Sequence, residues 1–171
     1  MRYLFITLLL SCTLSSSYAQ EWKKFTDTAG YFTAVYPDTW TAKIKENNHV
    51  FFTSPAEGEN DMFRQNINII ITKSDALKGF TIRDLVPDLL KNLETQYDNY
   101  ELISNKYFKW NGKESFEVVY NITQNGDTTS YRIKQWMYMA NGVFYVVTYT
   151  STSGSDALAE TAEKILNSIK F

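Results

Sequence analysis

Cysteine and histidine are almost absent from this chain of 171 residues, which contains one of each. Cys12 lies in a leader-like segment, and without that segment the chain can form no disulfide, thiolate metal site or cysteine nucleophile. His49 is the only histidine, so a zinc site built on a histidine pair is excluded. No serine stands in a recognisable nucleophile elbow. We therefore expect no enzymatic activity.

The chain also lacks a long apolar run and any cluster of basic residues. A membrane-spanning helix needs ~20 consecutive apolar residues, and the apolar stretch at 3–10 is much shorter. The formal net charge is −2, with 17 Lys plus Arg against 19 Asp plus Glu. A mildly acidic chain of this kind is not typical of proteins that bind nucleic acid or anionic membranes. We expect neither a transmembrane segment nor a nucleic-acid partner.

The first 19 residues have the pattern of a secretory signal peptide. A basic residue precedes the apolar run, and a small, polar stretch ends in Ser17-Tyr18-Ala19, a small-x-small cleavage pattern. This pattern predicts a mature chain that begins at Gln20 and is periplasmic or secreted. The sequence Leu9-Leu10-Ser11-Cys12 loosely resembles a lipobox, so a lipoprotein anchored through Cys12 is the alternative.

Residues 20–171 are typical of a single α+β domain. Alternating or β-branched apolar residues predict strands at 31–36, 41–45, 50–54 and 67–71. Three Asn-Gly pairs, at 111–112, 125–126 and 141–142, supply the positive φ angles of tight hairpin turns. They divide the next stretch into four antiparallel strands, at 101–110, 113–124, 128–140 and 143–151.

Helical spacing of apolar residues predicts two amphipathic helices. The first covers 81–97, with Thr81 as N-cap and Asp84 in its first turn. Pro87 either kinks this helix or marks where its regular part begins. The second helix covers 158–169. Together these elements predict one antiparallel sheet of about six to seven strands packed between helices, an α/β/α sandwich.

The segment from Gly30 to Trp40 joins an alternating strand to a proline stop and an aromatic anchor. Tyr36 closes the alternation, Pro37 cannot donate to a ladder, and Trp40 follows three residues later. This segment resembles the opening strand of the PsbP-like superfamily, and the closing Ile-Leu-Asn-Ser-Ile-Lys-Phe of 165–171 resembles its last helix and tail. We expect Gly30, Tyr36, Pro37 and Trp40 to begin and brace the sheet.

The resemblance implies a sheet packed between helices and a habit of binding other proteins rather than turning over substrates. The superfamily includes extrinsic proteins of photosystem II, a nuclear-import factor that binds a GTPase, and bacterial exported proteins or lipoproteins. The photosystem members engage calcium or manganese through a long N-terminal extension and histidine or acidic residues. Here only residues 20–24 precede the first expected strand, so the resemblance implies export and binding, not photosynthesis.

One face of the strand expected at 128–140 is a candidate partner-binding surface. Arg132, Lys134, Trp136 and Tyr138 alternate along the strand and therefore share that face. Its mixture of cationic and aromatic side chains is typical of protein contact surfaces. A buried position in the core is the alternative for the aromatic members.

The acidic segment at 57–61 is a candidate calcium site. Glu57, Glu59 and Asp61, together with Asn60, gather the hard oxygen ligands that calcium requires. The full acidic spacing of a calcium hand is missing, so a solvated loop is the alternative.

The sequence therefore predicts an exported, non-enzymatic PsbP-like domain that binds a protein partner or assists the assembly of a complex in the cell envelope. The alternative is an exported carrier of a small ligand or of calcium. Such a carrier would use the cleft between sheet and helix or the loop at 57–61. A hydrolase built around His49 is a third hypothesis.

Overall fold

The structure is a computed structural model that describes residues 20–45, 49–59, 61, 63–97, 99–123, 128–155 and 157–171. The expected signal peptide at 1–19, the Asn-Gly pair at 125–126 and Asn60 lie outside the described residues. Two α-helices are described, α1 (Ile82–Gln96) and α2 (Ala159–Ser168), with a short 3-10 helix at Asp75–Leu77. The described strands are β1 (Trp22–Thr26), β2 (Thr33–Pro37), β3 (Thr41–Lys45), β4 (His49–Thr53), β5 (Asn66–Lys73), β6 (Tyr100–Trp110), β7 (Lys113–Thr123), β8 (Ser130–Ala140) and β9 (Val143–Thr152).

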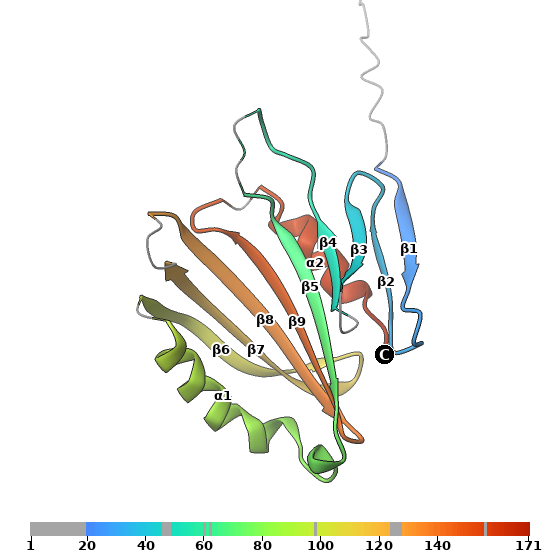
Figure 1. Cartoon of the computed structure of the whole chain (residues 1–171), viewed down its shortest axis with the longest axis vertical. Coiled ribbons are helices and arrows are strands. Elements are labelled where there is room, and N and C mark those ends of the chain that lie inside the picture. Colours follow the sequence, from blue (N-terminus) through green and yellow to red (C-terminus); the bar gives the residue numbers. More distant parts are fainter. Residues whose placement is uncertain are drawn as a thin grey trace, which may run out of the picture.

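Seven strands form one antiparallel sheet in the order β3-β4-β5-β9-β8-β7-β6 (Figure 1). Strands β6 to β9 are a continuous meander, and the connection from β5 through α1 carries the chain to the far edge at β6. Asn111 and Gly112 have φ angles of 50° and 76°, and Asn141 and Gly142 have 52° and 77°. These angles confirm the two Asn-Gly hairpin turns that the described residues include.

The segment expected to open the main sheet belongs to a separate, two-stranded sheet. β2 pairs antiparallel with β1, with Phe25 opposite Ala34 in the register. The expected antiparallel sheet of about six to seven strands is confirmed, but the strand expected at 31–36 does not belong to it, and its partner β1 was missed. The sequence of β1, Trp-Lys-Lys-Phe-Thr, has only one half-buried side chain and so gives little alternation to detect.

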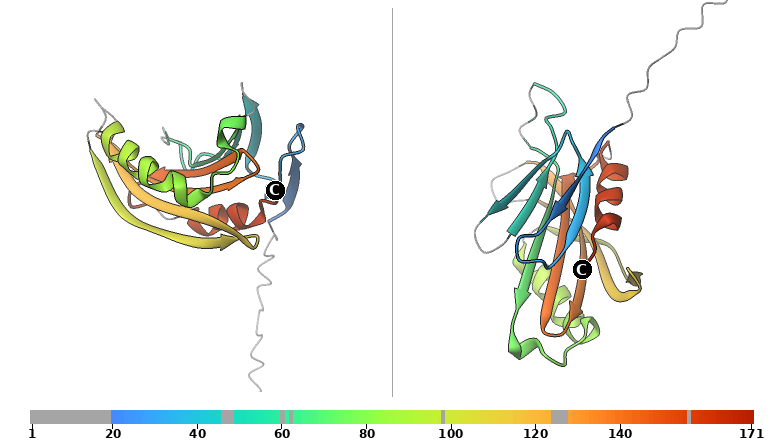
Figure 2. Two further views of the ribbon diagram at one scale, coloured as in Figure 1. Left: turned by 90° about the horizontal axis from the view of Figure 1, so that it is seen from below. Right: turned by 90° about the vertical axis from the view of Figure 1, so that its right-hand side faces the viewer.

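The two helices lie on opposite faces of the curved main sheet (Figure 2). α1 lies on the concave face and buries Ile82 and Val86 against residues of β7 and β8. α2 lies on the convex face, next to β2, and buries Ala162, Ile165 and Leu166. The α/β/α arrangement expected from the sequence is confirmed, with one hydrophobic core on each face of the sheet.

The C-terminal residues are hydrogen-bonded to β2. Thr33 N donates to the carbonyl oxygen of Lys170, and Lys170 N donates to that of Thr33, each at 2.9 Å. Val35 N also donates to Ser168 Oγ at 2.9 Å. These bonds hold the small sheet against the end of α2 by a short antiparallel bridge.

Helix α1 begins at the N-cap that the sequence predicts. The backbone N–H and the hydroxyl of Thr81 both donate to Asp84 Oδ2, at 2.7 Å. These hydrogen bonds hold the pKa of Asp84 below its usual value. Pro87 lies inside the helix on an exposed position, where water can satisfy the carbonyl that loses its N–H donor. The helix thus begins at Ile82 and not near Pro87.

Candidate functional site

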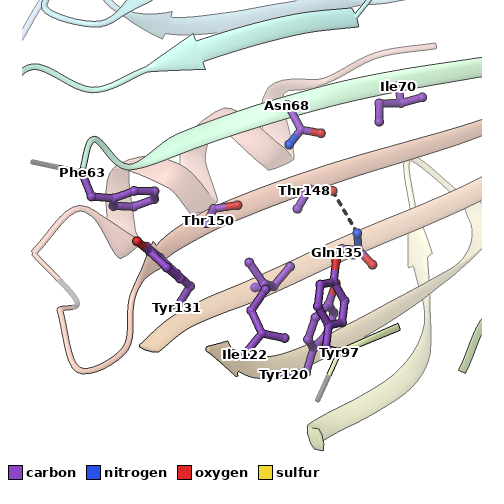
Figure 3. Close-up of a pocket in the computed structure, with 11 residues that line it drawn as sticks. Phe63, Asn68, Ile70, Tyr97, Tyr120, Ile122, Tyr131, Gln135, Thr148 and Thr150 are labelled. Atoms are coloured by element: carbon purple, nitrogen blue, oxygen red, sulfur yellow. Dashed lines mark hydrogen bonds between the residues drawn. The ribbon is translucent and has the colours of Figure 1, made fainter. Parts of the chain in front are cut away.

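A cleft of about 430 Å³ opens on the concave face of the sheet beside the C-terminal end of α1 (Figure 3). Strands β5, β9, β8 and β7 form its floor, and the end of α1 and the loop before β5 form its sides. The lining residues are Asn68 and Ile70 on β5, Thr148 and Thr150 on β9, Tyr131, Ile133 and Gln135 on β8, Tyr120 and Ile122 on β7, Tyr97 after α1, and Phe63 in the loop.

The floor of the cleft contains a row of polar side chains. Asn68 of β5 is opposite Thr148 of β9, which in turn is opposite Gln135 of β8. Gln135 Nε2 donates to Thr148 Oγ1 at 3.2 Å. Asn68 Oδ1 is buried and finds no hydrogen-bond donor within the described part of the chain. A buried acceptor without a donor is costly.

Two aromatic pairs lie near this row. Next to Gln135 the Tyr97 and Tyr120 ring centroids are 6.3 Å apart, and burial raises the pKa of the Tyr120 hydroxyl. To one side of the row, toward the start of β5 and β8, Phe63 packs against Tyr131 with ring centroids 4.8 Å apart. The Tyr120 hydroxyl therefore stays neutral at physiological pH, and the cleft offers aromatic faces and hydroxyl groups with no Asp, Glu, Lys, Arg or His beside them.

A second feature is the exposed edge strand β6. Leu102, Ile103 and Tyr107 of this strand are 44%, 46% and 39% exposed. The register between β6 and β7 shifts between Leu102 and Ser104, which is a β-bulge at Ile103. Arg83 of α1 lies 4.2 Å from the centre of the Tyr107 ring. β6 thus presents apolar side chains and the backbone groups of a sheet edge to solvent.

The structure places the predicted partner-binding face beneath α2 and the C-terminal residues. Trp136 and Tyr138 are 4% and 8% exposed and belong to the convex core. Lys134 pairs with Glu163 of α2 at 2.7 Å, and Arg132 is half-buried beside it. The four side chains do share one face, as predicted, but that face is not an open surface. Strand periodicity cannot tell which face a distant helix covers.

The three acidic residues of the predicted calcium site do not surround a common point. Asp61 accepts hydrogen bonds from the backbone N–H groups of Glu57 and Phe63, at 2.9 and 3.2 Å. Glu57 accepts one from Gln65 Nε2, and Glu59 is exposed. Among the described residues, no group of three His, Cys, Asp or Glu side chains is arranged to hold a metal ion. Asp61 thus holds the backbone of its own loop, whereas Glu57 binds a side chain.

The residues of the predicted structural motif lie in the two-stranded sheet and at its junction with the main one. Gly30 adopts a φ of 76°, and the ring centroids of Tyr36 and Phe52 are 5.1 Å apart. Pro37 is fully buried, and Trp40 is 3% exposed. Their bracing role stays a prediction. His49 begins β4 opposite Lys45.

Sequence reasoning missed the residues of the cleft, although one signal was present. In the strand at 66–73, Asn66 and Asn68 alternate with isoleucines, so amides occur at the positions of one face. Polar residues on a face that a sandwich fold covers with a helix point to a cavity or a ligand. Only the register brings Thr148 and Gln135 beside Asn68.

Fold and cleft together define a class: an α+β sandwich in which a cleft opens on the concave face of the sheet. No helix among the described residues is long and apolar enough to cross a membrane. The chain belongs to the PsbP family, whose model matches residues 20–171. No curated protein sequence matches the chain.

Solved structures of low sequence identity share the fold. Cyanobacterial PsbP (CyanoP) from Synechocystis is 17% identical, with a TM-score of 0.60 over 95% of this chain and 98% of that one. LpqN, involved in cell envelope biogenesis of Mycobacterium tuberculosis, is 12% identical, with a TM-score of 0.55 over 91% of this chain and 86% of that one. A Bacteroides thetaiotaomicron protein is 19% identical with a TM-score of 0.59 over 86% of this chain, which spans only 47% of that protein.

Proposed function

We propose that the chain is an exported, non-enzymatic PsbP domain that binds a protein partner in the cell envelope, and that the partner contacts strand β6. The observation that carries this proposal is the exposure of apolar side chains on that strand. Three of the eight large apolar side chains that are exposed among the described residues lie on β6. Soluble monomers rarely leave such side chains together in water unless another molecule covers them.

The chemistry of β6 suits the addition of a strand from a partner. As the last strand of the sheet, β6 offers its outer N–H and C=O groups to an extended segment, and neighbouring apolar side chains give affinity. The bulge at Ile103 and the charges of Lys106 and Lys109 oppose uncontrolled pairing between copies. The secretory leader pattern supports export, and the fold likeness to LpqN supports a role in the envelope.

Site-specific photo-crosslinking in living cells tests the proposal. A benzophenone amino acid replaces Ile103 in one variant and Ile44 in the other. Ile44 is a matched control because it is also an isoleucine, is also 46% exposed, and lies on β3 at the opposite edge of the sheet. We expect a discrete adduct with one protein from position 103, recovered in the envelope fraction, and none from position 44.

Two results would contradict the proposal. Equal adducts from both positions, or none from position 103, would remove β6 as the contact surface. Recovery of the protein and its adduct only from the cytosol would remove the exported role.

A further inference from the structure

The concave cleft and strand β6 are different surfaces, and no residue of β6 lines the cleft. The cleft therefore raises a separate question, which does not depend on the proposed partner. Its volume of about 430 Å³ lies within the range of about 300 to 1,000 Å³ that is usual for small-molecule sites. It is large enough to accept a compact ligand.

The first constraint on that ligand is charge. Among the described residues that line the cleft, none is Asp, Glu, Lys, Arg or His. An anionic or cationic ligand would lose its hydration without meeting an opposite charge, which is strongly unfavourable. Nucleotides, carboxylic acids and free metal ions therefore do not fit this lining, and a neutral ligand does.

The second constraint is the pattern of hydrogen-bonding groups. Asn68, Thr148 and Gln135 form a row of amide and hydroxyl groups across three adjacent strands. Each of these groups can both donate and accept, and the bond from Gln135 to Thr148 uses only one of the two amide hydrogens of Gln135. A ligand with several neighbouring hydroxyl groups matches this row, because every hydroxyl also donates and accepts.

The third constraint is the presence of two aromatic pairs near the row. Tyr97 and Tyr120 lie next to Gln135, and Phe63 with Tyr131 lies to one side of the row (Figure 3). An aromatic face carries partial negative charge and attracts the slightly positive C–H groups of an apolar ligand surface. A sugar ring combines such a C–H face with a rim of hydroxyl groups. An extended peptide has fewer hydroxyl groups and would leave much of the row unpaired.

We propose that the concave cleft binds an uncharged carbohydrate, with hydroxyl groups on Asn68, Thr148 and Gln135 and a C–H face of a sugar ring against the Phe63–Tyr131 pair. Phe63 is a half-buried residue of the loop before β5, so its ring can cover the sugar without being part of the central core. Gln135 supplies the hydrogen bonds that select for hydroxyl groups.

Titration of the protein, purified as the cell exports it, with neutral oligosaccharides tests this inference. The probes are maltotriose, cellotriose and diacetylchitobiose, with glucuronic acid as an anionic comparison and a neutral Gly-Ser-Asn peptide as a peptide comparison, each followed by amide NMR shifts. We expect at least one neutral saccharide to bind with a Kd of about 1 mM or tighter, and glucuronic acid and the peptide to cause no saturable shift.

Three variants identify the site. Phe63→Ala and Gln135→Leu should each weaken saccharide binding about tenfold or more, which is a change of one decade in Kd. Phe80→Ala is the matched control, because Phe80 is a loop phenylalanine that is 49% exposed and lies outside the cleft. It should bind as the unmodified protein does. Circular dichroism confirms that each variant is folded, and a variant that unfolds is replaced by Phe63→Leu or Gln135→Ala.

Several outcomes would overturn the inference. The first is that no neutral saccharide causes a saturable shift at about 10 mM, ten times the weakest expected Kd. The second is that glucuronic acid or the peptide binds as tightly as the saccharides or more tightly. The third is that the folded Phe63 and Gln135 variants keep the saccharide affinity of the unmodified protein. None of these results depends on whether a protein binds β6.

Discussion

The carboxylate of Glu117 lies in the convex core, and its removal gives the sharpest test of how that core is held. Glu117 is 6% exposed and accepts a hydrogen bond from Trp136 Nε1 at 2.6 Å. Lys106 and Lys134 lie 3.2 and 3.8 Å from its two oxygens. One carboxylate thus satisfies a buried indole and balances two lysines, one of which is largely exposed.

Two substitutions separate the charge of Glu117 from its hydrogen bond. Glu117→Gln keeps the shape and an acceptor for Trp136, so the loss is the difference between a charged and a neutral acceptor, about 1 to 2 kcal/mol. Glu117→Ala leaves the indole N–H buried without an acceptor, while Lys134 keeps Glu163 as its counter-charge. The unsatisfied indole costs about 1 to 3 kcal/mol more than the loss in Glu117→Gln.

Urea unfolding followed by circular dichroism measures both losses, with an unchanged m value showing that the same surface is exposed on unfolding. Glu114→Ala on the same strand is the control. It breaks the Arg83–Glu114 ion pair, whose side chains are 57% and 39% exposed, and solvent-exposed pairs contribute little. If Glu117→Ala were no less stable than Glu117→Gln, or if both matched Glu114→Ala, the carboxylate would not be holding the core.

Two further predictions concern the motif and the first helix. Trp40→Ala should lower the free energy of unfolding by about 3 to 5 kcal/mol, because Trp40 is 3% exposed. Trp22→Ala should lower it much less, because the Trp22 side chain is 37% exposed. Equal losses for the two variants in urea unfolding would refute the bracing role. The hydrogen bonds from Thr81 lower the pKa of Asp84 in the folded protein. Their contribution to stability is therefore complete above pH values near 3.9, the usual pKa of Asp in an unfolded chain. It is lost as the pH falls through the lower pKa that Asp84 has in the folded protein. Asp84→Asn should therefore be less stable than the unmodified protein at pH 7 and should lose less stability on acidification, as Tm measured against pH will show; parallel curves would contradict this.

The parts of the fold that the sequence predicts are those set by local chemistry. The turn at Asn141-Gly142 could be placed because only a few residue types accept two consecutive positive φ angles. Helix α1 could be placed because its apolar stripe and its cap, Thr81 with Asp84, lie within one segment. By contrast, β1 owes its existence to pairing with β2, and its only inward side chain, Phe25, gives no pattern.

The candidate sites were harder to predict, because each depends on tertiary contacts. Trp136 and Tyr138 were placed correctly on one face of their strand, but whether α2 covers that face is decided by the packing of the helix. The cleft depends on the register that joins Asn68, Thr148 and Gln135, three residues far apart in the chain. Amides inside an isoleucine-rich strand were the one local sign of it.

The bridge between Thr33 and Lys170 also has a mechanical consequence. Its two hydrogen bonds of 2.9 Å join β2, the second strand of the chain, to the residues that follow α2. A tension applied between residues 20 and 171 would load this bridge and the neighbouring contact between Val35 and Ser168 before it reached the meander of β6 to β9. The small sheet and the C-terminal residues would separate first, and the larger sheet would keep its strand pairing until the Thr33–Lys170 bridge had broken.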